Sequence, residues 1–478
     1  MRPRHGLLAL PVLAFLVAFL PAQDAGPQLG NGIKIGEVTT TSARVWARLT
    51  REAEARFDGL PFPARKQDEP QLPEGVTLED MEGAVPGADG SVRLRYRVGS
   101  GDEQVMPWVA VDGTTDSCHT FRLEGLAPGR TVSIVVEVAG IQEDGAEPRI
   151  SASLDGSFRT APAADVSHPA SFCVIACQDH PRRDEGEGGH AIYREMLALD
   201  PDFLVHTGDT LYYDRAGPFA RNVPTARFKW NRFYGLRLPQ QFHRAVPAWF
   251  IKDDHDTLKN DCWPGQSYGE LTFEQGLAIY REQLPVGDRS YRHQRFGRHL
   301  ELWFLEGREF RSPNRMEDGP DKTILGRAQM EWLAETLAAS DATFRVVVSA
   351  TPIVGPDRQA KNDNHANVGF QHEGDALRDL LSTEPGVVVV CGDRHWQYAS
   401  HDLRTGLREW GCGPASDGHA GGFSLAARTE EHDYLKICGG FLHVDVTLEG
   451  EVPSLRIRHR GVDGRVTHED VLSAPAGR

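Results

Sequence analysis

The chain lacks long apolar runs after its first residues, and basic side chains are in the minority. A protein with several membrane spans needs apolar runs of about 20 residues, so that class is excluded. The 478 residues include 52 basic and 68 acidic side chains, and this balance of -16 argues against a protein that coats nucleic acid. A site for one phosphate group stays open, because bound metal ions reverse the sign of the local charge. The length predicts about two or three globular domains.

The amino terminus has the pattern of an export signal. Arg2 and Arg4 precede an apolar run over residues 7–20, and the small residue Ala22 follows. Because this run is short for a bilayer span, we expect a signal peptide over residues 1–22 and a secreted or periplasmic mature protein without a membrane span. An uncleaved anchor at this end is the alternative.

Cysteine is scarce, and its number is odd. In an oxidising compartment, seven cysteines leave at least one without a disulfide partner or bound to another group. Cys177 is the candidate, because it lies just past the end of a predicted strand among other polar residues. Cys173 and Cys391 lie inside apolar strands and are predicted to be small core residues.

Residues 30–161 have an all-β pattern. Alternating apolar and polar residues are separated by turn sequences, which is typical of a fibronectin- or immunoglobulin-like sandwich. Residues 52–90, rich in proline, glycine and acidic side chains, predict an insertion in this sandwich, and a linker is expected over residues 160–169. Nothing in this part collects nucleophiles or metal ligands.

From residue 170 to 478 the pattern changes to α/β. Continuous apolar strands alternate with stretches of helical spacing, which indicates sheets covered by helices on their outer faces. The predicted strands are 172–176, 203–206, 247–251, 300–305, 344–349 and 387–391, and the predicted helices are 190–199 and 326–338.

Five of these strands are followed directly by polar side chains. Any one such group is common loop chemistry, but five in order at carboxyl ends of strands predict one shared site. Together they offer thiolate, carboxylate, phenolate and imidazole groups, which are metal ligands. The groups are Cys177-Gln178-Asp179, Gly208 to Tyr212, Asp253 to Asp256, Glu306-Gly307-Arg308 and Gly392 to His395.

This order of motifs resembles the calcineurin-like metallophosphoesterases, and among them the alkaline phosphatase D (PhoD-like) family. The resemblance puts Cys177 at the first acidic ligand position and makes Asp209 the bridging carboxylate. Tyr212 matches the Gly-Asp-x-x-Tyr pattern shared with purple acid phosphatases. Asp254 replaces the asparagine of Gly-Asn-His-Asp, and Gly392-Asp393-Arg394-His395 replaces Gly-His-x-His. The implied fold for residues 170–478 is a metallophosphoesterase domain, a two-sheet sandwich flanked by helices.

Two departures from the superfamily pattern bear on one metal site. Residues 346–351, where a lone histidine is expected, contain none, and Asp393 stands where the first histidine of Gly-His-x-His belongs. The ligands left there are Asp209, Asp254 and Asp393, with water or Asn260 as possible helpers. An all-oxygen site of this kind suits calcium or magnesium better than zinc.

The second site combines Cys177, Asp209, Tyr212 and His395. A thiolate and a phenolate are strong anionic donors, which favours a ferric ion. The resemblance implies the same pairing, Fe3+ with Ca2+.

The predicted function is that of a secreted, metal-dependent phosphodiesterase or phosphomonoesterase that uses a metal-activated water on a small phosphate ester. By motif position, His255 is expected to donate a hydrogen bond to the phosphate or a proton to the leaving group. Arg308 is expected to clamp a phosphate oxygen. A hydrolase specialised for a phospholipid or a nucleotide, and an inactive surface-binding relative, are the alternatives.

Histidines outside these motifs have no spacing that suggests a role. We therefore expect no catalytic function for His243, His293, His419 and His432. Asp214, Asp253 and Asp256 are predicted to support loops or ligands, although Asp253 competes with Asp254 for the metal.

Overall fold

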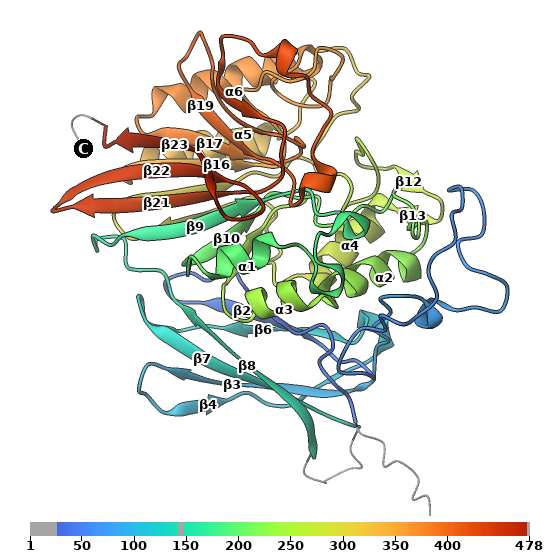
Figure 1. Cartoon of the computed structure of the whole chain (residues 1–478). Coiled ribbons are helices and arrows are strands. Elements are labelled where there is room, and N and C mark those ends of the chain that lie inside the picture. The colour runs from blue at the N-terminus through green and yellow to red at the C-terminus, as the bar shows by residue number, and fades with distance from the viewer. Residues whose placement is uncertain (1–25, 142–147, 476–478) are drawn as a thin grey trace, which may run out of the picture.

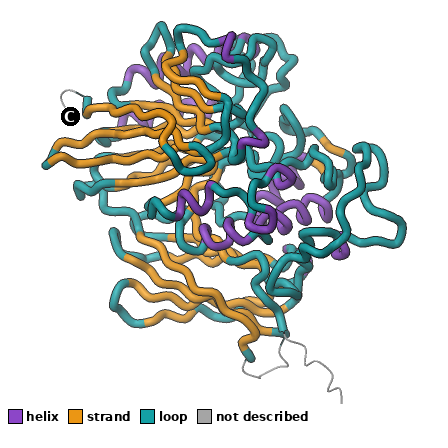
Figure 2. The backbone as a smooth tube through the Cα atoms, in the orientation of Figure 1, coloured by secondary structure: helices purple, strands orange, loops and turns teal. Residues whose placement is uncertain are grey.

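The computed structural model describes residues 26–141 and 148–475, so the export signal predicted over residues 1–22 lies outside the described residues. The described helices include none that combines the length and the apolar character needed to cross a bilayer. Figure 2 shows the strands gathered in stacked layers, with helices along the outer faces of the upper two.

A nine-stranded sheet runs through the middle of the molecule, in the order β23-β22-β21-β9-β10-β11-β1-β2-β6. The central strands β9, β10 and β11 are parallel. The strand bounds are β1 Ile33–Gly36, β2 Ala43–Arg48, β6 Cys118–Leu123, β9 Ala170–Ile175, β10 Phe203–His206, β11 Ala248–Phe250, β21 Phe441–Glu449, β22 Val452–Arg460 and β23 Val466–Ser473.

A seven-stranded sheet, in the order β14-β15-β16-β17-β19-β18-β20, faces the first. Its strands β15, β16, β17 and β19 are parallel. The bounds are β14 Arg292–Phe296, β15 Leu300–Phe304, β16 Phe344–Ser349, β17 Val387–Cys391, β18 Gln397–His401, β19 Arg408–Cys412 and β20 His432–Lys436. The short hairpin β12 Ser267–Tyr268 and β13 Leu271–Thr272 stands apart from both sheets.

Helices cover the outer face of each sheet (Figure 1). In β9, Phe172 and Val174 point into the core between the sheets, while Cys173 and Ile175 pack against helices. Because both faces are buried, the central strands are apolar at most positions, which confirms the α/β arrangement predicted from the sequence. α1 to α4 cover the nine-stranded sheet, and α5 and α6 cover the other. The bounds are α1 Ile192–Leu197, α2 Val223–Tyr234, α3 Arg237–His243, α4 Phe273–Gln283, α5 Arg327–Ala339 and α6 Gln371–Thr383.

Local sequence explains where two of these helices begin. The Asn222 side chain accepts a hydrogen bond from the backbone N–H of Thr225 at the start of α2. At the start of α4, Thr272 and Gln275 form a reciprocal capping box. Both arrangements satisfy backbone donors that the first helical turn leaves free.

The amino-terminal part consists of two β layers around a separate apolar core. One layer is β1, β2 and β6, which form the end of the nine-stranded sheet because Gly36 of β1 pairs with Ala248 of β11. This part therefore continues the sheet of the following domain. The other layer has the order β4-β3-β7-β8, with β5 beside β3. Its bounds are β3 Gly90–Val98, β4 Glu103–Val105, β5 Val109–Val111, β7 Thr131–Ala139 and β8 Ile150–Arg159.

Residues 52–90, the predicted insertion, form a long loop with one 3-10 turn, η1 Leu78–Asp80. Glu82 of this loop forms ion pairs with Arg232 of α2 and, at 3.1 Å, with Arg183, which follows β9. The loop therefore ties the amino-terminal layers to the segment that leads toward the strand ends.

Candidate metal centre

The candidate site lies where the carboxyl ends of strands from both sheets meet. Ala176, just past β9, forms a bridge with Pro414, just past β19. Directly beyond the ends of β9, β10 and β17, the backbone turns into the left-handed region at Cys177, Asp209 and Asp393, with φ values of 54°, 54° and 60°. Non-glycine residues adopt this conformation at a cost, and such strain is concentrated at functional sites.

Two glycines allow these turns to come close together. A Cβ atom on Gly208 would lie 2.6 Å from Cβ of Asp253 and 2.7 Å from its backbone nitrogen. A Cβ on Gly392 would lie 2.5 Å from Oγ1 of Thr207. Only glycine fits at either position, which is the physical reason for the two Gly-Asp pairs in the sequence.

The four residues predicted to hold iron lie together. Sγ of Cys177 is 3.5 Å from Oδ2 of Asp209, and the Tyr212 hydroxyl is 3.1 Å from the same oxygen. The Tyr212 hydroxyl is also 3.3 Å from Nε2 of His395. Ligand atoms of Cys177, Asp209 and His395 all lie within 4.8 Å of one another, a spacing that suits one metal ion.

The charge of this group fits a bound cation. Cys177, Asp209 and Tyr212 are buried, and burial raises the pKa of each well above its usual value. Oδ1 of Asp209 has no hydrogen-bond partner in the described part of the chain. A buried anion without a partner is very unfavourable, whereas a metal ion among these atoms stabilises their charged forms.

Carboxylates form a second group around Asp209. Asp209, Asp253 and Asp393 can offer oxygens within 4.8 Å of one another, and so can Asp209 and Asp254 together with a nitrogen of His255. Both oxygens of Asp254 accept backbone N–H groups, from His255 at 2.8 Å and Asp261 at 2.6 Å.

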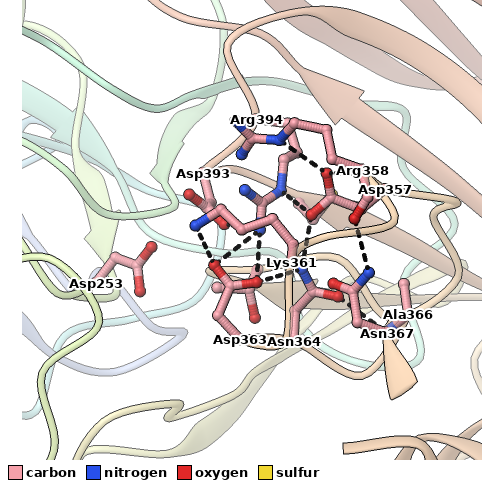
Figure 3. A network of polar contacts seen from close by, with 12 residues as sticks. Asp253, Asp357, Arg358, Lys361, Asp363, Asn364, Ala366, Asn367, Asp393 and Arg394 are labelled. Carbon is pink, nitrogen blue, oxygen red and sulfur yellow. Dashed lines mark hydrogen bonds and ion pairs between the residues drawn. The ribbon is translucent and has the colours of Figure 1, made fainter. Parts of the chain in front are cut away.

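Asp253 differs from Asp254 in the hydrogen bonds that its carboxylate oxygens accept. Its Oδ2 is buried without a hydrogen-bond partner among the described residues. Asp253 thus offers a free oxygen beside Asp209 and Asp393, and Figure 3 shows Asp253 and Asp393 on the same side of a polar network. Both neighbouring aspartates remain candidate ligands, with Asp253 the less engaged of the two.

His255 lies beside the carboxylates and lines the cleft above them. Its Nδ1 is 2.6 Å from Oδ1 of Asp214, and its Nε2 is 3.9 Å from Oδ1 of Asp254. Burial alone lowers the pKa of His255, but the carboxylates of Asp254, Asp209 and Asp214 raise it to about 10. Asp214 thus holds Nδ1 of the ring, and Nε2 faces the candidate ligands.

Arg308, the predicted phosphate clamp, pairs with Asp253. Its side chain is buried, its Nε donates to Oδ1 of Asp253 at 2.6 Å, and it does not line the cleft. Asp253 engages Nε and Nη2 of this guanidinium, while Nη1 is buried without a hydrogen-bond partner among the described residues. The structure thus places Arg308 against a carboxylate of the candidate centre, and the phosphate clamp stays a prediction.

His419 is a site residue that the sequence did not reveal. It lies in the 3-10 turn η6 Asp417–His419, and its Nδ1 donates to the carbonyl oxygen of Cys177 at 3.1 Å. Its ring centroid is 4.0 Å from that of His395 and 5.2 Å from that of Tyr212. Nε2 is buried without a partner in the described part. The sequence predicts no catalytic function for His419, and its contacts with three candidate ligands suit a positioning residue.

A cleft of about 200 Å³ opens above these groups. Candidate ligands and His255 line it, and the more exposed side chains Arg215, Arg358 and Lys361 lie at its rim. The lining residues are Asp209, Arg215, His255, Asn260, Arg358, Lys361, Asp393, Arg394, His395, Trp396 and Gly421.

Comparisons with known proteins point to phosphatases. Residues 172–425, more than half of the chain, match the family model of PhoD-like phosphatases. Alkaline phosphatase D of Bacillus subtilis (strain 168) is 23% identical over 300 residues, which are 52% of this chain and 49% of that protein. The match therefore spans about half the length of this curated relative.

Two solved structures share the fold. A structure of PhoD superposes with a TM-score of 0.69 at 17% identity, covering 95% of this chain and 90% of the other. The purple acid phosphatase PPD1 from yellow lupin (Lupinus luteus) seeds gives 0.63 at 13% identity, covering 93% of this chain and 74% of the other. At these identities the similarity demonstrates a common architecture.

Proposed function

The chain belongs to the PhoD-like phosphatase family, and from this premise we propose that it is a metal-dependent hydrolase of phosphate monoesters or diesters. The observation that carries the proposal is the convergence of a thiol, a phenol, an imidazole and several carboxylates beneath one open cleft. Such a donor set holds cations, and the cleft admits a small phosphate ester.

We assign the two groups of side chains to two kinds of metal ion. Cys177, Asp209, Tyr212 and His395 would hold Fe3+, because thiolate and phenolate are strong anionic donors. Asp209 and Asp393, with Asp254, Asp253 or both, would hold Ca2+ or another hard divalent ion, because all these donors are oxygens. When bound, the two ions would supply positive charge for the phosphate oxygens and would acidify a water molecule.

The chain's own side chains position and protonate the substrate in this proposal. Asp214 holds Nδ1 of His255, which leaves Nε2 directed toward Asp254 and the cleft. His255 therefore donates a hydrogen bond to a phosphate oxygen or a proton to the departing alkoxide. Arg308 and Arg394 keep the carboxylates of Asp253 and Asp393 in place.

We also propose that the protein acts outside the cytoplasm. The positively charged start, the apolar run over residues 7–20 and Ala22 support export by a cleaved signal. Mass spectrometry of the mature amino terminus tests this, because an intact Met1 in the released protein contradicts cleavage.

The proposed activity is tested with bis(p-nitrophenyl) phosphate and p-nitrophenyl phosphate on purified protein of known metal content. We expect turnover of at least one ester, and a loss of about 100-fold or more in Asp209→Asn. Asp165→Asn is the matched control: Asp165 is exposed, does not line the cleft, and its replacement should keep full turnover. Absence of turnover in protein that contains both metal ions would contradict an enzymatic role and favour the inactive surface-binding relative. A glycerophosphodiester and a nucleotide in the same assay separate the phospholipid and nucleotide alternatives.

A further inference from the structure

Three basic side chains from two distant segments stand around the cleft above the metal centre. Arg215 belongs to the loop that follows β10, whereas Arg358 and Lys361 belong to the loop that follows β16. That second loop starts at the position where the superfamily pattern has its lone histidine. The segment that lacks a metal-binding histidine thus brings two cations to the rim of the cleft.

Arg215 and Arg358 are available to bind an anion. Arg215 is exposed, has no carboxylate within 4 Å in the part of the chain that the structure describes, and lies over the Tyr212 ring at 5.5 Å. The Arg358 side chain is 37% exposed, and the carboxylate that it contacts among residues 26–141 and 148–475 is the neighbouring Asp357, at 3.4 Å. Its guanidinium lies 5.4 Å from the centre of the Trp396 ring, which orients it along the cleft wall.

Arg394 is held very differently. It is buried, and it contacts Asp357 at 3.0 Å, Asp363 at 3.3 Å and Asp393 at 2.5 Å. Asn364 donates to both Asp357 and Asp363 at 3.0 Å, so these carboxylates are engaged inside the network that Figure 3 shows. Arg394 is therefore structural, and it holds the loop in the shape that presents the rim cations.

Lys361 lies between the network and the cleft. Its Nζ is 2.7 Å from Oδ2 of Asp363, and its side chain is 26% exposed. In Figure 3 its amine points to the side where Asp393 and Asp253 lie. Because Asp363 also contacts Arg394, Lys361 is only partly neutralised and can contact an anion that enters the cleft.

We propose that these rim cations bind a second anionic group of the substrate, beside the phosphate that is cleaved. The inference rests on the proposed function, in which metal ions and His255 already serve the scissile phosphate. In a chain with a balance of -16, three basic side chains around one cleft form a local group of positive charge that attracts anions. The preferred substrate is therefore a phosphate ester with a further phosphate or carboxylate, which a guanidinium fork binds well.

A matched pair of chromogenic substrates tests this. Thymidine 5′-(p-nitrophenyl phosphate) and the same compound with an added 3′-phosphate release the same p-nitrophenol and differ by one anionic group. We expect the metal-loaded protein to show about 10-fold higher kcat/KM for the 3′-phosphorylated compound. In the double variant Arg358→Gln/Lys361→Gln, and to a smaller extent in Arg215→Gln, this ratio should approach 1.

The control keeps the charge change but moves it away from the cleft. Arg327→Gln/Lys436→Gln removes two exposed cations, one on α5 and one on β20, and should retain the ratio. A ratio near 1 in the unaltered protein overturns the proposal. So does a rim variant in which both compounds slow equally, because the cations would then serve the scissile phosphate itself.

If the proposed hydrolase activity is wrong, the second anion site can still be tested by binding. If neither compound is hydrolysed, calorimetric titration with thymidine 5′-phosphate and thymidine 3′,5′-bisphosphate still tests the rim. Tighter binding of the bisphosphate, lost in the Arg358→Gln/Lys361→Gln variant, supports the second anion site without catalysis. Equal binding of the two nucleotides overturns it.

Discussion

In the amino-terminal layers, strands such as β3 and β7 largely alternate buried residues with more exposed ones, whereas β10 is buried at every position and β9 and β17 at nearly every position. A strand with one solvent-exposed face carries polar side chains along its whole length. A strand buried on both faces carries few of them before it ends. Chemistry is therefore spread thinly over the amino-terminal layers and concentrated at the strand ends of the following domain.

The two regions also differ in what their buried groups need. The core of the amino-terminal layers consists of aliphatic and aromatic side chains that pack against one another. The strand-end site contains the buried thiol of Cys177, and Asp209 and Asp253 each have a buried oxygen without a hydrogen-bond partner among the described residues. The first region is expected to govern stability, and the second to govern metal binding and turnover.

The largest expected effect comes from removing the shared carboxylate. Asp209→Asn and Asp393→Asn should each lower turnover by about 100-fold or more and lower metal content, because each removes an anionic ligand. The unfolding temperature of metal-free protein should change little, since neither sheet core contains these side chains. Elemental analysis, turnover and calorimetry check this, and normal turnover in Asp209→Asn with full metal content contradicts its bridging position.

A core substitution in the amino-terminal layers should have the opposite profile. Ile134→Ala, in β7, leaves a cavity and should lower the free energy of unfolding by about 2–5 kcal/mol. Metal content per folded molecule should stay unchanged. The surface control Arg122→Gln, which breaks an exposed ion pair with Glu124, should cost less than about 1 kcal/mol. Loss of metal in folded Ile134→Ala would show that the two regions are not separable.

Replacement of the candidate thiolate tests the iron site. Cys177→Ser keeps the size of the side chain but offers a much poorer anionic donor, so iron affinity should fall by about 10–100-fold. The visible charge-transfer band of a tyrosinate bound to ferric ion should weaken in parallel. Cys438→Ser, at a less buried cysteine that does not line the cleft, is the control and should keep both.

Alkylation mapping of the same protein examines the state of Cys177. All seven cysteines lie among the described residues and none forms a disulfide. We expect Cys177 to react with thiol reagents only after the metal has been removed by a chelator. A disulfide at Cys177 in active protein, or zinc at both positions without iron, contradicts the assignment.

The smallest of these effects should come from His419, which contacts ligands and is not itself assigned as one. His419→Ala should lower iron affinity by about 10-fold, because the Cys177 loop loses a hydrogen bond and His395 loses a packed ring. His419→Asn, which keeps a donor near Nδ1, should recover part of this loss. Iron retention during dialysis and the wavelength of the visible band measure it, and unchanged values in the alanine variant would leave His419 without a positioning role.

Local patterns in the sequence predicted much of this structure. Continuous apolar runs predicted strands that the structure shows at β9, β10, β15, β16 and β17, and helical spacing predicted α1 and α5. Strand ends bring side chains to one edge of a sheet, so the chemistry of the centre was visible in the order of its motifs. The convergence of Cys177, Asp209, Tyr212 and His395 follows from that rule.

Other features depended on contacts between distant parts of the chain. The pairing of Gly36 with Ala248, which joins the amino-terminal layers to the central sheet, has no signal in either segment alone. His419 reaches Cys177 only because the chain returns to the site after β19. The directions in which neighbouring side chains point decide whether Asp253 or Asp254 faces the candidate metal. They also decide that Arg308 pairs with Asp253.

The sequence by itself determined the elements, the types of ligand and their order along the chain, because periodicity and strand ends are local properties. Only the tertiary structure decided which cations are held inside and which face the cleft. Arg308 and Arg394 are neutralised by buried carboxylates, while Arg215 and Arg358 remain at the rim. All arginines carry the same guanidinium group, so the sequence does not distinguish them. The burial and the partners of each side chain give it its function.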